Sequence, residues 1–392
     1  MRSNVTSCRQ QIGLSLIELM IAMVVGLVLM AGVLSIFISS RSGYGANTAG
    51  AQVQEYGRFA LDFMRGNVRM TSYMGCTTAA RSNSILNSVG QLYNFLLPVY
   101  GYEYNGTDPA TATSASPYVI ASETPAGTTL TSGTWTPVGD STTDVTPVGS
   151  NPGAKLTNAV PGSDALVLLS ASGDPVYLTA PSAGGTLAVT TSTTLAVGQL
   201  AVISDCVKST AFQVGTSDNT TPGILTIGSL LPGPGNYQNN FSVGYQSGSQ
   251  VLAANVMVYY VGQDADNSPA LFQAQLQPNG PFAGSFAKPQ VIVPGVENMQ
   301  VLYGVDTTGG STLTSPNQYL TAAQVDATNN WANVLSVQLG LLIRSSTGAV
   351  PLPTAAPTFD LLNTYITAPR DTRLRHVFTA TIYLRNAPLP TS

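Results

Sequence analysis

The chain has 392 residues, of which 15 are Lys or Arg and 19 are Asp or Glu, giving a formal net charge of −4. This mild acidity argues against nucleic acid as the main partner, because such binding normally needs a basic stripe. The length exceeds a typical single domain, so we expect one large or two smaller globular lobes. Only 9% of the residues are charged, and short hydroxyl side chains abound, in agreement with an exported protein.

The N-terminal region consists of a polar leader followed by a long apolar run. Residues 1–13 contain two arginines, and residues 14–38 contain a single charged side chain, Glu18. Roughly 20 apolar residues are enough for a helix to span a bilayer, so residues 14–38 are predicted to be a transmembrane helix. The leader arginines should stay in the cytoplasm, which sends everything after this run across the inner membrane.

The junction between the leader and the apolar run has the pattern of a processing signal. Gly13 is followed by Leu14, and Glu18 comes one helical turn further on within an apolar stretch. This pattern resembles the class III signal of type IV pilins and type II secretion pseudopilins. The resemblance implies that a prepilin peptidase cleaves after Gly13 and methylates the new N-terminus at Leu14. Phe is the commonest residue in that family where this chain has Leu14.

Glu18 is a carboxylate inside a predicted membrane-spanning helix, which makes it a functional candidate. Its place in the first turns lowers the cost, because the N-terminal end of the helix dipole favours anions. The pilin resemblance implies that its partner is the N-terminal amine of a neighbouring subunit, so that charge neutralisation guides docking into the growing filament. The alternative is that Glu18 only extends to the inner interface of the membrane.

The chain contains three cysteines, and processing would remove one of them. Cys8 lies in the leader, which leaves Cys76 and Cys206 on the mature protein. An even pair in an oxidising compartment is expected to form a disulfide, here between the end of the N-terminal helix and the β-rich body. The alternative is two separate buried thiols, since free cysteine packs as a small apolar residue.

Residues 39–75 are predicted to continue the helix as an amphipathic second half that packs on the globular domain. Mostly apolar residues recur at three- and four-residue steps, which is a helical pattern: Val53, Tyr56, Ala60, Phe63, Asn67 and Met70. Glycines between residues 39 and 50 loosen the start of this segment. Gly57 and Gly66 each weaken the helix by roughly 1 kcal/mol relative to alanine.

Residues 76–392 are predicted to form a β-rich periplasmic or extracellular domain. Short apolar runs bounded by turn residues indicate strands at residues 164–169, 199–204, 256–261, 299–305, 334–343 and 376–384. The expected fold class is therefore α+β, with one long N-terminal helix followed by a largely antiparallel β-sheet domain. Residues 107–153 are rich in Thr, Ser, Gly, Pro and Ala and are expected to be a lightly structured surface insertion, either a binding loop or a solvated tether.

Several of these segments resemble the PilW family of minor pilins. The matching motifs are residues 162–166, 203–206, 295–306, 331–337 and 375–386. The resemblance spans most of the mature chain outside residues 107–153. It implies a low-abundance subunit that primes pilus assembly together with other minor pilins, near the filament tip.

The sequence contains no constellation that indicates catalysis. The single histidine, His376, lies in a predicted strand, which excludes a multi-histidine metal site, and no GxSxG, P-loop or HExxH pattern occurs. Residues 306–311 and the group Asp264, Asp266 and Asn267 are weak calcium candidates, but solvated turns are expected, because calcium takes six to eight oxygens. We therefore predict no enzyme activity, cofactor, metal or small-molecule substrate.

The predicted function is that of a minor pilin that helps to prime and assemble type IV pili. Its expected partners are the prepilin peptidase, the major pilin and other minor pilins. The expected location is the inner membrane, with the N-terminus in the cytoplasm, and then the filament on the cell surface. Two alternatives remain open: a type II secretion pseudopilin, and a tip adhesin that binds through residues 107–153. The chain length and the motifs at residues 296–306 and 375–386 favour the pilus over the secretion system.

Overall fold

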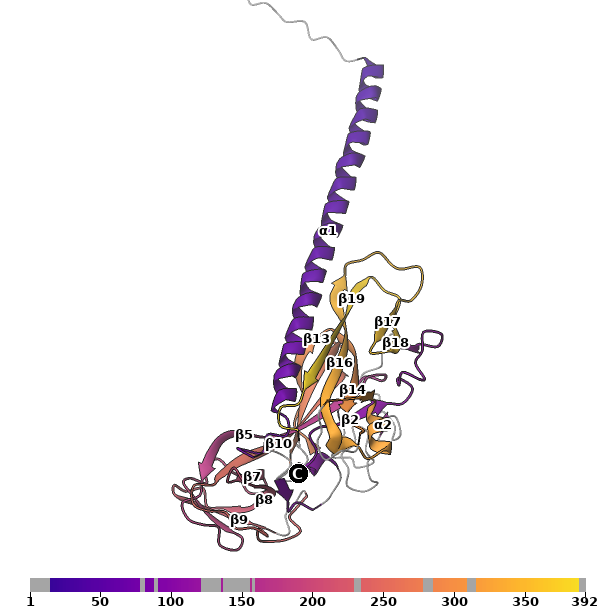
Figure 1. The fold of residues 1–392 in the computed structure, drawn as a ribbon. Coiled ribbons are helices and arrows are strands. Elements are labelled where there is room, and N and C mark those ends of the chain that lie inside the picture. Colours follow the sequence, from indigo (N-terminus) through magenta and orange to yellow (C-terminus); the bar gives the residue numbers. More distant parts are fainter. Residues whose placement is uncertain are drawn as a thin grey trace, which may run out of the picture.

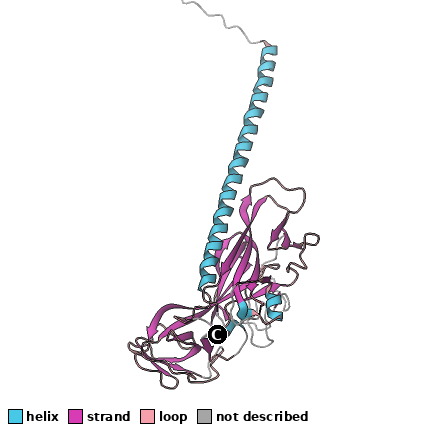
Figure 2. Ribbon diagram, in the orientation of Figure 1, coloured by secondary structure: helices cyan, strands magenta, loops and turns pink. Residues whose placement is uncertain are grey.

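A single long helix extends from a β-rich body (Figure 1). The computed structural model describes residues 15–77, 82–87, 91–120, 135–136, 156, 159–228, 234–277, 285–308 and 315–387. The helix, α1 (Leu16–Met70), has 55 residues. Its C-terminal half lies along the body, whereas its N-terminal half projects beyond it. Strands form most of the remaining regular structure (Figure 2).

Helix α1 is continuous through the glycine-containing stretch at residues 39–50. Glycine lowers helix propensity there but removes no backbone hydrogen bond. The helix ends at Met70, before the expected boundary at residue 75. Ser72 adopts a left-handed conformation with φ 58°. The Thr71 and Ser72 hydroxyls donate to the carbonyl oxygen of Pro98 at 2.9 and 2.8 Å, which turns the chain out of the helix.

The buried face of α1 is rotated relative to the predicted stripe. The residues that the body covers are Ala49, Val53, Gly57, Ala60, Met64 and Val68. Val53 and Ala60 were predicted correctly, but Tyr56 and Phe63 are only half-buried and Met70 is exposed. The centre of the face consists of small residues, which allow the helix and the body to approach closely. Large apolar side chains dominate a helical sequence pattern, so small residues indicate the buried face only weakly.

The largest sheet has twelve strands. Its main path runs β4-β2-β5-β10-β7-β8-β9-β6, with β1 beside β8, β11 beside β10, and β12 and β13 beside β11. The strands are β1 (Ser82–Ser84), β2 (Tyr100–Tyr104), β4 (Trp135–Thr136), β5 (Ala165–Tyr177), β6 (Thr186–Val189), β7 (Leu200–Ser204), β8 (Ser209–Ser217), β9 (Gly223–Ile227), β10 (Gln250–Gln263), β11 (Pro269–Gln277), β12 (Ser285–Phe286) and β13 (Gln290–Pro294). The short β1 pairs with β8 in parallel, and the other described pairings in this sheet are antiparallel.

Two smaller sheets complete the described part of the body. The four-stranded sheet has the order β15 (Gln318–Leu320), β14 (Val296–Val305), β16 (Val334–Gly348) and β19 (Arg373–Tyr383), and it is antiparallel throughout. The third sheet contains β17 (Thr358–Leu361), β18 (Thr364–Thr367) and β3 (Tyr118–Val119). Three short helical segments are η2 (Gln91–Tyr93), α2 (Ala322–Ala327) and η4 (Trp331–Asn333).

The expected fold class is confirmed: a long N-terminal helix precedes a largely antiparallel β domain. The six predicted strands correspond, in chain order, to β5, β7, β10, β14, β16 and β19. Each was recognisable because an apolar run of strand length lies between turn residues.

The main hydrophobic core joins α1 to both larger sheets. Trp331 lies at its centre, with its ring centroid 4.6 Å from that of Tyr100 and 4.9 Å from that of Tyr303. A second core fills the part of the body built from β5 to β9, where Phe212 and Tyr245 are buried. A third, smaller core contains Ile120, Leu342, Leu361, Ile366 and Ala368.

Part of residues 107–153 is built into the body. β3 pairs with β18 and β4 pairs with β2, while Ile120 and Trp135 are buried. The Trp135 indole donates to the carbonyl oxygen of Ser163 at 2.8 Å. Residues 107–117 contain only turns and bends, whereas Tyr118–Val119 and Trp135–Thr136 are short strands that the sequence did not indicate, since isolated large side chains in a Thr/Ser/Gly-rich stretch make no periodic pattern. Residues 121–134 and 137–155 lie outside the described residues.

Candidate functional site

The N-terminal half of α1 has an apolar surface that nothing in the described chain covers. Its large hydrophobic side chains from Leu16 to Ile38 are all exposed. One 18-residue window of the helix has a mean hydropathy of 2.8 and is 0% buried. In length and composition this is a helix that could cross a membrane, and its exposed side chains require an apolar environment outside the chain.

Glu18 lies in the first turn of this helix. Ser15 is the N-cap residue, and its side-chain oxygen accepts a hydrogen bond from the backbone N–H of Glu18 at 3.3 Å. An anionic side chain at this end is favoured by the helix dipole. The Glu18 side chain is exposed, so its carboxylate is free to meet a cation from outside the chain. The predicted processing residues, Gly13 and Leu14, lie outside the described residues, as does Cys8.

The C-terminal half of α1 is seated on β19 and β16, with further contacts to β13 and β5. The Ser346 hydroxyl donates to Gln52 Oε1 at 3.0 Å, and the Gln52 amide donates to the Tyr56 hydroxyl at 3.0 Å. At the lower end of the helix, the Asn386 side-chain amide donates to the carbonyl oxygen of Thr71 at 3.1 Å. The helix is therefore held at both ends of its buried segment.

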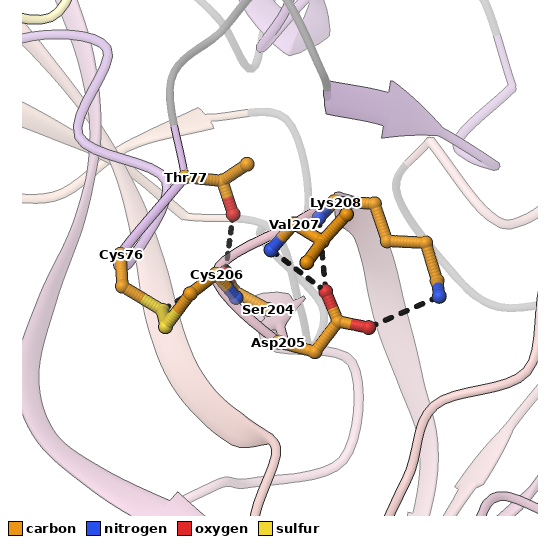
Figure 3. Close-up of a disulfide and its surroundings, with 7 residues drawn as sticks. All are labelled: Cys76, Thr77, Ser204, Asp205, Cys206, Val207 and Lys208. Carbon is orange, nitrogen blue, oxygen red and sulfur yellow. Dashed lines mark hydrogen bonds and ion pairs between the residues drawn. A yellow bond between two sulfur atoms is a disulfide. The ribbon is translucent and has the colours of Figure 1, made fainter.

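A disulfide joins Cys76 to Cys206 (Figure 3). Cys76 comes shortly after the end of α1, and Cys206 lies in the turn between β7 and β8, where it adopts a left-handed conformation with φ 68°. The two residues are 130 positions apart in the sequence. The cross-link therefore ties the exit of the helix to the part of the body that contains the second core.

The turn that carries Cys206 is fixed by the side chain of Asp205. Asp205 Oδ1 accepts from the backbone N–H groups of Val207 and Lys208 at 3.0 and 2.9 Å, and Lys208 Nζ lies 3.0 Å from Asp205 Oδ2 (Figure 3). Burial acts to raise the pKa of Asp205, but these hydrogen bonds outweigh it and lower the pKa below its usual value. Asp205 therefore stays ionised and holds the turn at neutral pH.

The segments singled out as family motifs meet at the junction between the two larger sheets. The side-chain amides of Asn298 and Gln300 donate to the carbonyl oxygen of Gly162 at 2.6 and 2.9 Å. Asp164 accepts from the backbone N–H groups of Val301 and Tyr104 at 2.8 and 3.0 Å. These polar groups are buried and mutually satisfied, so the motifs at residues 162–166 and 295–306 have a structural role.

Sequence inspection missed a group of buried acids at this junction. Burial raises the pKa of Glu103 to about 7, against the opposing effect of hydrogen bonds from Thr321 and Ala323. Burial, followed by the charge of Glu103, also holds the pKa of Asp164 well above its usual value. Nothing in the local sequence around Glu103 marks it as buried, apart from its place in a run of tyrosines that forms β2.

The described residues include no group of three or more His, Cys, Asp or Glu side chains that could hold a metal ion. Asp264 Oδ1 accepts from the backbone N–H groups of Asp266 and Ser268 at 2.9 and 2.8 Å, and Asp306 Oδ1 accepts from the backbone N–H of Thr308 at 3.0 Å. These carboxylates therefore close turns. His376 is exposed on β19, where its ring stacks edge-on against a neighbouring aromatic side chain on the same strand.

Two family models match the chain. Residues 258–386 match the model described as Type IV Pilus-assembly protein W (PilW), and residues 8–34 match the prokaryotic N-terminal methylation motif. No curated protein matches the chain. Among solved structures, the type IV-like pilin TTHA1219 from Thermus thermophilus shares 21% sequence identity with it, covering 35% of this chain and 70% of that chain with a TM-score of 0.21.

A helix with an uncovered apolar half, a β-rich body and a prokaryotic N-terminal methylation motif define a type IV pilin-like protein. Within that class, residues 258–386 match the PilW model, in agreement with the resemblance to PilW minor pilins seen in the sequence. Of the motifs recognised in the sequence, those at residues 295–306, 331–337 and 375–386 fall inside the matched region.

Proposed function

We propose that this minor pilin primes and assembles type IV pili from a position near the filament tip. The observation that carries the proposal is the uncovered N-terminal half of α1. The inner membrane covers this apolar surface before assembly, and the helices of neighbouring pilins cover it afterwards. The body then lies in the periplasm and, after extension of the filament, at the cell surface.

The processing signal and Glu18 supply the mechanism of entry into the filament. The prepilin peptidase cleaves after Gly13 and methylates Leu14, which leaves the apolar helix on the mature protein. The exposed Glu18 carboxylate near the start of α1 then pairs with the N-terminal amine of a neighbouring subunit. Both charges are costly in an apolar environment, so their pairing favours the correct axial position of the new subunit.

The test is a deletion strain in which pilus retraction is also disabled. We expect the major pilin sheared from the cell surface to fall, while type II secretion of exported proteins stays normal. Normal pili with failed secretion would instead assign the chain to the secretion system. Re-expression of the wild-type chain should restore surface pilin.

The tip-adhesin alternative has a separate test. Deleting all of residues 107–153 would remove the buried Trp135 and disturb the body. Replacing only residues 121–134 with a Gly/Ser linker of equal length spares Ile120 and Trp135. Intact pili with lost attachment would support adhesion through this segment, and unchanged attachment would exclude that segment as the binding surface.

A further inference from the structure

The β-rich body has a pocket of about 470 Å³. It is lined by the turn between β10 and β11, by the segment that leads from β18 into β19, and by side chains of β14 and β16. Its volume is within the range of about 300–1,000 Å³ that is typical of small-ligand sites. The cationic side chains that line it are Arg344, Arg370 and Arg373.

Two of the carboxylates that line the pocket, those of Glu297 and Asp371, are already bound by a fourth arginine. Arg375 donates to Glu297 through Nε and Nη2 at 2.6 and 2.9 Å. It also donates to Asp371 through Nη1 and Nη2 at 2.6 and 2.8 Å. The Arg375 side chain is only 1% exposed, so this double fork is a fixed part of the protein interior. Both carboxylates are therefore committed to a guanidinium that does not line the pocket.

The arginines that line the pocket have hydrogen-bond donors that the described residues do not use. Arg344 gives one nitrogen, Nη1, to Glu297 at 3.0 Å. Arg370 Nε donates to the carbonyl oxygen of Pro353 at 2.7 Å, which leaves its terminal nitrogens free. The described residues give the Arg373 guanidinium no hydrogen-bond or ion-pair partner, although Arg373 is half-buried.

The local charges do not balance. The floor of the pocket holds three guanidinium groups, those of Arg344, Arg373 and Arg375, but only two carboxylates, those of Glu297 and Asp371. At the rim, Arg370 adds one positive charge and Asp266 adds one negative charge. Burial lowers the pKa of Arg344, and the charges of its arginine neighbours lower it further, against the attraction of Glu297. A guanidinium is always protonated in proteins, so the excess positive charge persists at every pH at which the protein is folded, and a bound anion would neutralise it.

We propose that this pocket binds an oxyanion of the phosphate type, held by Arg344 and Arg373 and steered by Arg370. The planar guanidinium fork matches two oxygens of such a group and forms charge-assisted hydrogen bonds with them. Two sources of the same chemistry are a free phosphate ion and the phosphate of a lipid headgroup. The second is considered because Ser346 bonds to Gln52 on α1, about four helical turns from the end of the apolar half at Ile38.

The experiment uses the full chain purified in maltoside micelles, which contain no phosphate. Thermal unfolding is followed while inorganic phosphate replaces chloride at constant ionic strength, so that general screening stays the same. We expect the melting temperature to rise with phosphate concentration in a saturable way, as for a ligand that binds the folded state. Arg373→Gln should weaken the apparent affinity at least tenfold with little change of the melting temperature in chloride, because the Arg373 side chain makes no hydrogen bond or ion pair with the described residues.

The matched control is Arg385→Gln, which removes an exposed arginine outside the pocket and should leave the phosphate response intact. Arg370→Gln should weaken the response less than Arg373→Gln, because Arg370 lies at the rim. Equal responses of the wild type and Arg373→Gln, or no response of the wild type beyond that of chloride, would overturn the proposal.

A second arm identifies the source of the anion. The same titration is repeated in phospholipid nanodiscs. If free phosphate stabilises the protein in micelles but not in nanodiscs, and Arg373→Gln removes that difference, a lipid phosphate already occupies the pocket. If phosphate stabilises it equally in both, the ligand is a free anion. A failure of either arm leaves the pilus assignment untouched, because pilus assembly is measured independently.

Discussion

The ring of Phe378 lies directly against the backbone of Gly57. A Cβ atom on Gly57 would stand 2.3 Å from Phe378 Cζ, closer than any such contact in a folded protein. Phe378 comes from β19 and Gly57 from the buried face of α1. This glycine, which lowers helix propensity, is therefore what allows the helix to lie close to the sheet.

Gly57→Ala should destabilise the protein although alanine is the better helix former. Overpacking typically costs 1–3 kcal/mol, which exceeds the roughly 1 kcal/mol gained in helix propensity. Gly66→Ala is the matched control, because Gly66 is on the same helix and has open space around it, so this variant should be more stable than the wild type. The measurement is the thermal unfolding midpoint of each variant in micelles.

A second pair of variants tests the contact itself. In a Phe378→Ala background the obstacle is gone, so Gly57→Ala should become stabilising. If Gly57→Ala raises the midpoint as Gly66→Ala does in the otherwise wild-type protein, the close contact between Gly57 and Phe378 is not as described.

Loss of the disulfide should lower stability strongly. The loop that Cys76 and Cys206 close spans 130 residues, for which the chain-entropy model gives a stabilisation of about 5 kcal/mol as an upper value. The Cys76→Ser and Cys206→Ser double variant should unfold at a lower denaturant concentration than the wild type. Reductant should lower the wild-type midpoint toward that of the double variant and leave the double variant unchanged. Reductant-insensitive wild-type protein with two free thiols would contradict this.

Stability should depend on pH through Glu103. The folded state holds the pKa of this buried carboxyl at about 7, above the unfolded value of 4.5, so folding favours the protonated form. Its contribution is fully favourable below pH 4.5, is lost as the pH rises toward 7, and then levels off at a cost of about 3 kcal/mol. Glu103→Gln should therefore stabilise the protein at pH 8 and have little effect at pH 4.5.

The control for this pH dependence is Asp174→Asn, which changes an exposed carboxylate on β5. Urea unfolding at both pH values gives the comparison. An unchanged pH profile in Glu103→Gln would show that other buried groups, such as Asp164, control the acid stability.

Glu18→Ala should reduce entry into filaments without reducing membrane insertion. Removing a carboxylate from the apolar segment makes insertion easier, whereas docking loses its charge partner. The measurement is the ratio of this protein in sheared pili to that in the membrane fraction, with retraction disabled. Glu55→Gln changes an exposed carboxylate on the second half of α1 and should leave the ratio unchanged. An unaltered ratio in Glu18→Ala would disprove the docking role.

The fold class and the principal strands could be predicted because their signals are local. An apolar run such as residues 334–343 lies between turn residues and needs no partner to be recognised. The buried face of α1 could not be placed to the residue, because it depends on Phe378 from a strand far along the chain. The short strands β1 and β3 were missed for the same reason, since each exists only through its pairing with a distant strand.

Some residues of the candidate site could likewise be named from local sequence, whereas others depend on contacts between distant segments. Gly13, Leu14 and Glu18 could be named from sequence because a signal is recognised by linear spacing. The Cys76–Cys206 pairing followed from having only two cysteines after the leader. The arginine pocket was invisible, because Arg344 and Arg373 become neighbours only when β16 and β19 pair.

The packing of α1 against the body also determines when, during biosynthesis, the buried face of the helix becomes covered. The helix is made before the strand with which it makes its most extensive contact, β19 (Arg373–Tyr383), and about 300 residues separate the two in the sequence. Until that strand has been exported, the apolar face from Ala49 to Val68 is only partly covered, by β16, β13 and β5, and is more open to proteases and to wrong associations. Only a chain translated through β19 completes this cover, so fragments that stop short expose apolar surface on both halves of α1.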